Sequence, residues 1–129
     1  MGYGGACKKA AEDDRGILYQ YMSFNLNLPN AGEQVFDGSI YIGKTCFIEP
    51  EIHEKFKRMP SGHRKHIIKR IRRNIPLEEY LQSGKAVIEN CSRTWVMDAE
   101  GRDMIARRLV HELIGRYMDE GEIPLTCAV

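Results

Sequence analysis

Positively charged residues are concentrated in one short part of this chain. Between Lys55 and Arg73 there are nine Lys or Arg residues and no Asp or Glu. The rest of the 129 residues contains ten bases against 18 acids, so a net charge of +1 conceals a strong separation of charge. Such a segment is suited to binding a polyanion or an acidic protein, and nucleic acid has the highest linear charge density among these partners.

Two helices are predicted to present these bases. The i, i+4, i+7 spacing of Ile52, Phe56 and Met59 gives an apolar stripe that predicts a helix over residues 50–59. A Pro-Ser-Gly turn follows, in which the serine is expected to cap the next helix. That second helix, over residues 61–74, is predicted to be amphipathic, with isoleucines toward the core and cations toward solvent.

The predicted helix, short turn and basic helix resemble the helix-turn-helix arrangement of DNA-binding proteins. The second helix would then enter the major groove, with His63, Arg64 and Lys65 near base edges. Phosphate contacts would come from Lys69, Arg72 and Arg73. The complete set of predicted binding residues is Lys55, Lys57, Arg58, His63, Arg64, Lys65, Lys69, Arg70, Arg72 and Arg73.

The sequence favours duplex DNA or structured RNA over a single strand. No aromatic residue lies between Phe56 and Tyr80, so this segment encodes no platform on which bases could stack. The leading interpretation is therefore a small non-enzymatic nucleic-acid-binding protein, such as a regulator or accessory factor.

Three alternatives remain open. The same cationic face would suit an adaptor, inhibitor or immunity-type protein that grips an acidic protein, and a flat face with apolar residues among the cations would favour this interpretation. A solvated face without a partner is the second alternative. The third is an enzyme whose site is assembled from distant residues. Self-association into a homo-oligomer is also left open.

Other chemistry has little support in the sequence, and no catalytic residue, metal or cofactor is predicted. The motif beginning at His111 has Gly115 where a zinc-protease helix would need its second His. The four cysteines are isolated from one another, so they are expected to be reduced thiols. We expect two of them, Cys46 and Cys91, to be buried, and Cys7 and Cys127 to be the more reactive pair.

The predicted fold class is α+β, with a small antiparallel sheet of N-terminal strands and one central β segment. A helical insertion over about residues 50–83 carries the basic helix. A long helix over residues 102–120, capped by nearby acids and ended by Gly121, is expected to pack on the sheet through a broad apolar arc. In the strand over residues 17–28, the side with Leu18 and Met22 is expected to be buried.

The chain is predicted to form a single domain over residues 1–129, with residues 1–15 as a polar, flexible arm. Its N-terminus lacks the apolar stretch of about 7–15 residues that a signal peptide requires. No apolar run approaches the roughly 20 residues of a membrane helix. We therefore expect an intracellular, cytoplasmic protein that does not associate with membranes.

Overall fold

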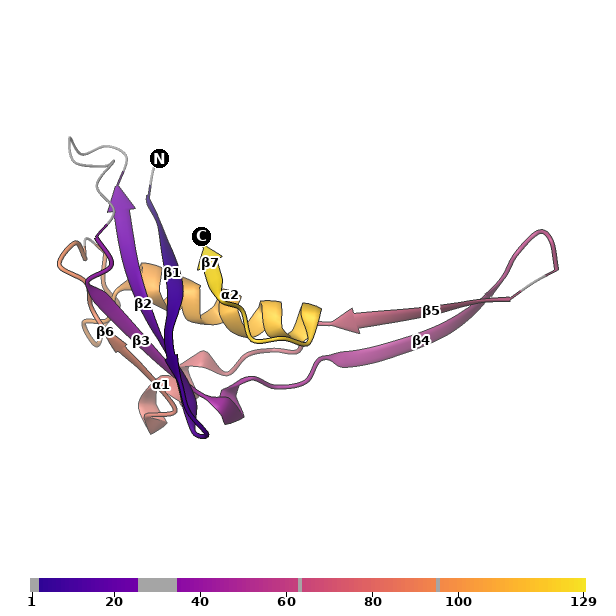
Figure 1. The fold of residues 1–129 in the computed structure, drawn as a ribbon, viewed down its shortest axis with the longest axis horizontal. Coiled ribbons are helices and arrows are strands. Elements are labelled where there is room, and N and C mark those ends of the chain that lie inside the picture. The colour runs from indigo at the N-terminus through magenta and orange to yellow at the C-terminus, as the bar shows by residue number, and fades with distance from the viewer. Residues whose placement is uncertain (1–2, 26–34, 63, 95) are drawn as a thin grey trace.

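The protein has a mixed α+β fold in which a five-stranded antiparallel sheet packs against one long helix (Figure 1). The computed structural model describes residues 3–25, 35–62, 64–94 and 96–129. The strand order in the sheet is β6-β3-β2-β1-β7, and a separate two-stranded sheet pairs β4 with β5. The elements are β1 (Tyr3–Glu12), β2 (Gly16–Asn25), β3 (Gly38–Gly43), β4 (Glu51–Arg58), β5 (Arg64–Ile71), α1 (Leu77–Ser83), β6 (Ala86–Glu89), α2 (Met104–Glu120) and β7 (Thr126–Ala128).

Most of the expected N-terminal arm is instead the strand β1, which lies between β2 and β7. Its small residues suit this place, because Gly5 and Cys7 face α2 across a short distance. A Cβ added to Gly5 would lie 2.5 Å from Cγ2 of Ile105, so the helix packs directly on the strand backbone. The polar residues that suggested an arm, among them Lys8 and Glu12, are exposed in the structure, whereas the small residue Gly5 permits close packing on α2.

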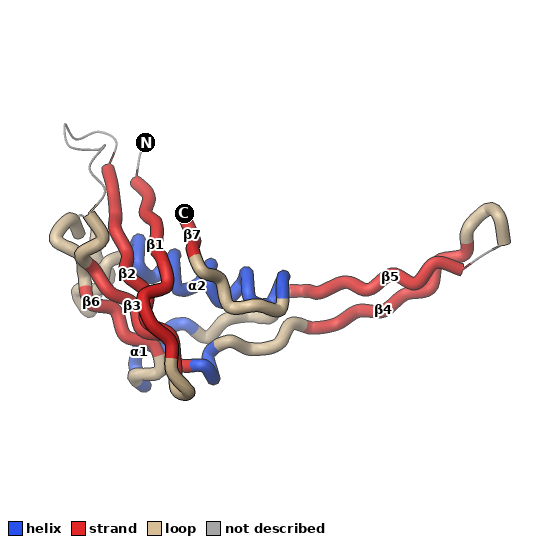
Figure 2. The backbone as a smooth tube through the Cα atoms, in the orientation of Figure 1, coloured by secondary structure: helices blue, strands red, loops and turns tan. Residues whose placement is uncertain are grey.

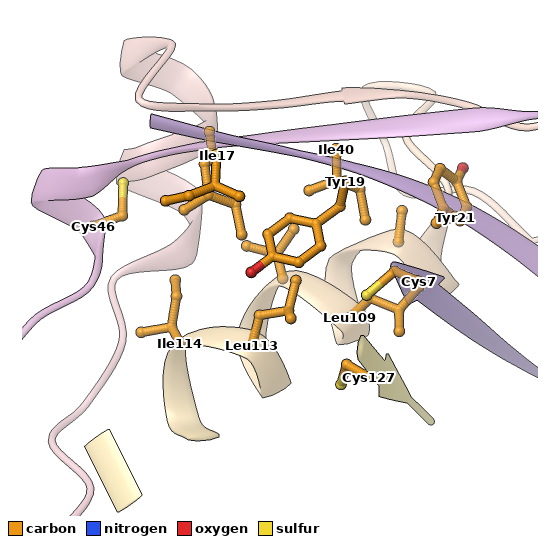
Figure 3. Packing of buried hydrophobic residues seen from close by; sticks show 14 of the residues in the cluster. Cys7, Ile17, Tyr19, Tyr21, Ile40, Cys46, Leu109, Leu113, Ile114 and Cys127 are labelled. Atoms are coloured by element: carbon orange, nitrogen blue, oxygen red, sulfur yellow. The ribbon is translucent and has the colours of Figure 1, made fainter. Parts of the chain in front are cut away.

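The core lies between the sheet and α2, where Tyr19 packs among isoleucines and the helix leucines (Figure 3). The side of β2 that faces the core carries Ile17, Tyr19 and Tyr21, so the expectation that the opposite side is the buried one was wrong for Leu18, although Met22 on that side is also buried. Leu18 itself is 37% exposed. The tyrosines can be buried because their hydroxyls find partners, as the bond from Tyr19 Oη to the Pro124 carbonyl at 2.7 Å shows.

A buried polar network fixes the start of α2. Asp103 is the N-cap, as expected for the acids before this helix, and its Oδ1 accepts a hydrogen bond from the Ile105 amide at 2.9 Å. Its Oδ2 accepts from Tyr21 Oη at 2.9 Å, and the same hydroxyl accepts from the Cys91 amide at 2.9 Å. Burial raises the pKa of Tyr21 above its ordinary value, so the phenol remains a donor.

Both helices of the body end at a glycine, and Gly121 is the stop that the sequence predicts for the longer one. Gly84 follows α1 and Gly121 follows α2, each in the left-handed conformation that favours glycine. The apolar arc of α2 is buried, with Leu109 and Leu113 fully inaccessible. No helix in the described part of the chain is long and apolar enough to cross a membrane.

All four cysteines are buried and reduced. This confirms the expectation for Cys46 and Cys91 and corrects it for the other two. Cys7 and Cys127 face each other as direct partners in the β1–β7 pairing, with exposed fractions of 2% and 4%. Neither thiol is positioned to react readily with external reagents.

Leu113→Ala is expected to lower the free energy of unfolding by roughly 2–5 kcal/mol, because it empties a fully buried site between α2 and the sheet. Denaturant unfolding followed by circular dichroism measures this change. The matched control is Leu125→Ala, since Leu125 is 66% exposed and should change stability little. Equal effects of the two substitutions would contradict the packing described here.

Candidate nucleic-acid interface

The basic segment forms a long β ribbon, not a pair of helices. Strands β4 and β5 pair along their whole length and project away from the sheet and α2 (Figure 2). We use "the ribbon" for β4, β5 and the turn between them. The predicted helices over residues 50–59 and 61–74, and with them the helix-turn-helix arrangement, were wrong.

The sequence of the ribbon explains its turn. The Gly62 amide donates to the Met59 carbonyl at 2.9 Å, and Pro60 occupies the second position, where its restricted φ suits a turn. Gly62 has φ of 88°, a conformation that favours glycine. Ser61 therefore lies in a turn between strands rather than at a helix N-terminus.

The two faces of the ribbon carry different cations. Successive side chains of a strand point to opposite faces, and directly paired residues share a face. The register pairs Lys57 with Lys65 and Arg58 with Arg64. One face, the lysine face, therefore carries Lys55, Lys57, Lys65 and Lys69. The other, the arginine face, carries Arg58, Arg64 and Arg70.

The arginine face also carries exposed apolar side chains that the sequence analysis did not assign to the site. Ile52, Phe56 and Ile68 are 48%, 63% and 57% exposed. The Phe56 ring stacks on the imidazole of His66, with a centroid distance of 4.6 Å and an interplanar angle of 11°. No apolar–polar alternation in the sequence marks this face, because Glu54 lies on it between Ile52 and Phe56.

The acids of the ribbon do not neutralise its cations. Glu51 lies 3.0 Å from the imidazole of His53, and Glu54 lies 3.7 Å from that of His66. Among the described residues, no ion pair involves any Lys or Arg of β4 or β5. The positive charge of the ribbon is therefore directed toward solvent.

Two of the predicted binding residues instead hold the base of the ribbon against α2. Arg72 Nη2 lies 2.6 Å from Asp119 Oδ2 and 3.4 Å from Glu112 Oε1. Gly115 leaves room for this guanidinium, since a Cβ there would lie 2.6 Å from Arg72 Nη1. Arg70 Nε donates to the Met118 carbonyl at 2.8 Å, near the C-terminal end of the helix.

The other predicted residues divide into three groups. Arg73 lies just beyond β5, where its amide donates to Met118 Sδ at 3.3 Å, so its backbone belongs to the base of the ribbon. His63 lies outside the described residues. The ribbon brings together Lys55, Lys57, Arg58, Arg64, Lys65 and Lys69.

The chain matches no protein-family model, no curated protein and no solved structure. Within the described residues, no group of three or more His, Cys, Asp or Glu side chains is placed to hold a metal ion. The features of the described chain that bear on its function are therefore the shape, exposure and charge of the ribbon.

The base of the ribbon should weaken in acid. The hydrogen bond from Arg72 lowers the pKa of Asp119 below its ordinary value, although partial desolvation opposes this shift. A carboxylate whose pKa is lower in the folded than in the unfolded protein stabilises the fold fully at pH values above the unfolded pKa, which is near 4. This stabilisation is lost as the pH falls through the lower, folded-state pKa. Asp119→Asn should therefore destabilise the protein at pH 7, by up to about 1 kcal/mol for a half-exposed pair, and hardly at all near pH 2.

The free energy of unfolding of the wild type and of Asp119→Asn is measured between about pH 2 and pH 7. Glu120→Gln is the control, because Glu120 is an exposed acid of the same helix turn without an ion pair among the described residues. A stability difference between wild type and Asp119→Asn that stays constant from pH 7 to pH 2 would contradict the assigned role of this carboxylate.

Proposed function

We propose that this protein binds nucleic acid through the ribbon, as a non-enzymatic regulator or accessory factor. The observation that supports the proposal is the exposure and charge of β4 and β5. Every side chain of these strands is exposed except that of Ile67, which is half-buried, and seven of them belong to Lys or Arg residues. A two-stranded ribbon of this kind contributes little to a core and is marginally stable alone. Contact with an external polyanion accounts for both its exposure and its charge. Such a partner fits the intracellular location expected from the sequence.

The dimensions of the ribbon suit a duplex. Each strand has eight residues, which at about 3.3 Å per residue gives a length of roughly 26 Å. Duplex DNA carries one phosphate charge per ~1.7 Å of axis, so roughly 15 phosphates lie within that length. The major groove, about 12 Å wide, accepts a two-stranded ribbon.

An acidic protein is the second candidate partner, and the arginine face specifically favours it. Ile52, Phe56 and Ile68 lie among the cations there, and apolar contacts of this kind are typical of the core of a protein interface. The protein would then act as an adaptor, inhibitor or immunity-type protein. The dependence of binding on salt separates the two candidates, because apolar contacts resist salt and phosphate contacts do not.

Affinity for a labelled duplex should fall steeply with salt. With four to six bases engaged, the slope of log K against log salt should be roughly −4 to −5, since each neutralised phosphate contributes about −0.9. The double substitution Lys57→Gln and Lys65→Gln should make that slope shallower by about 1.8. Fluorescence anisotropy measures the slopes of the wild type and the double variant, with duplex DNA and duplex RNA as probes. The salt concentration is varied from about 50 to about 300 mM, the range over which phosphate contacts weaken.

A matched control removes the same charge from the body of the protein. Lys85 and Arg108 are exposed and form no ion pair among the described residues, so replacing both by Gln should leave the slope unchanged. An absence of measurable binding to either duplex at about 50 mM salt would refute the proposal. An equal effect of the two doubles would show that net charge, not the ribbon, determines binding.

A further inference from the structure

The two pairs of residues nearest the tip of the ribbon place like charges directly opposite each other. Lys57 faces Lys65 on the lysine face, and Arg58 faces Arg64 on the arginine face. Like charges in such positions destabilise a β ladder. A ribbon that buries almost nothing has little other stability to offset this repulsion, so the tip is the part that would gain most from a bound anion.

The pairs nearer the base are arranged differently. Lys55 faces Ile67, Lys69 faces His53, and Arg70 faces Ile52, so no Lys or Arg faces another there. Arg70 is also engaged by the Met118 carbonyl. The density of unneutralised charge therefore rises toward the tip, at the end of the ribbon away from the body (Figure 1).

The two like-charged pairs point in opposite directions, so a single flat anionic surface cannot contact both. They match an anion that lies on both sides of the ribbon. A strand pair with its side chains is about 10 Å thick, judged from the spacing of packed sheets. This thickness fits the major groove of B-form DNA, about 12 Å wide, and not the minor groove, about 6 Å wide.

We propose that the tip of the ribbon enters the major groove of B-form duplex DNA. The lysine pair contacts one phosphate backbone and the arginine pair contacts the other. The turn from Met59 to Gly62 then points toward the base edges. This inference rests on the proposed function and narrows it to DNA, because the major groove of an A-form RNA duplex is too deep and narrow for side chains to read.

Groove-specific competitors test this placement. Methyl green occupies the major groove of DNA and distamycin occupies the minor groove. With a mixed-sequence duplex DNA probe at low salt, methyl green should displace the protein and distamycin should not. The reverse pattern, or affinity for duplex RNA equal to that for duplex DNA, would overturn the major-groove placement while leaving nucleic-acid binding intact. Binding to no nucleic acid would overturn both proposals.

Charge substitutions at the two ends of the ribbon test the role of the tip. Replacing the lysine pair or the arginine pair by Gln should each reduce the magnitude of the salt slope by about 1.8. Replacing Lys55 and Lys69 by Gln removes the same charge nearer the base and should reduce it by less than about 0.9. Equal reductions for all three doubles would mean that the ribbon binds along its whole length, and would refute entry of the tip.

Discussion

The contact between Arg72 and the acids of α2 determines where the ribbon points. Two paired strands without a third strand or a core are only marginally stable, so the direction of the ribbon depends on its base. There, Arg72 binds Asp119 and Glu112 across the space left by Gly115, and Arg70 binds the Met118 carbonyl. These contacts join the most basic part of the chain to an acidic part of the body.

The helix that receives the ribbon is itself fixed by burial. Its apolar arc, including Leu109 and Leu113, packs on the inner face of the sheet, and Asp103 secures its first turn through Tyr21. The sheet therefore positions α2, the acids of α2 position Arg72, and Arg72 positions the ribbon. Exposure of the ribbon is compatible with a stable fold because its residues are not needed in the core.

How well the sequence predicted each element depended on how much of that element is buried. The helix α2 has one buried face over 17 residues, so its 3.6-residue period is strong. Capping by one of the preceding acids and termination at Gly121 were both predicted correctly. The ribbon is exposed on both faces, so no alternation of buried and exposed residues marks it as β. The spacing of Ile52, Phe56 and Met59 fits a helix, and two of these residues also fit one face of a strand. Because neither face of the ribbon packs in a core, the spacing of these three residues did not distinguish a helix from a strand, and the helix predicted from it was wrong.

The charge of the candidate site could nevertheless be read from the sequence. A segment with nine bases and no acid concentrates positive charge whether it folds as a helix or as a strand. Most of the predicted residues do lie together on the ribbon. The sequence could not separate Arg70 and Arg72, which anchor the ribbon, from the residues that face solvent, because this depends on contacts with helix residues 48 and 47 positions away. The division into lysine and arginine faces likewise requires the strand register.

A lysine-labelling footprint shows whether the tip of the ribbon is the part of the protein that contacts DNA. The protein is acetylated briefly with and without duplex DNA at low salt, and the modification of each lysine is measured by mass spectrometry. We expect DNA to protect Lys57 and Lys65 most strongly and to leave the body lysines Lys9 and Lys85 as reactive as in the free protein. Protection of the body lysines while those of the ribbon remain reactive would contradict it.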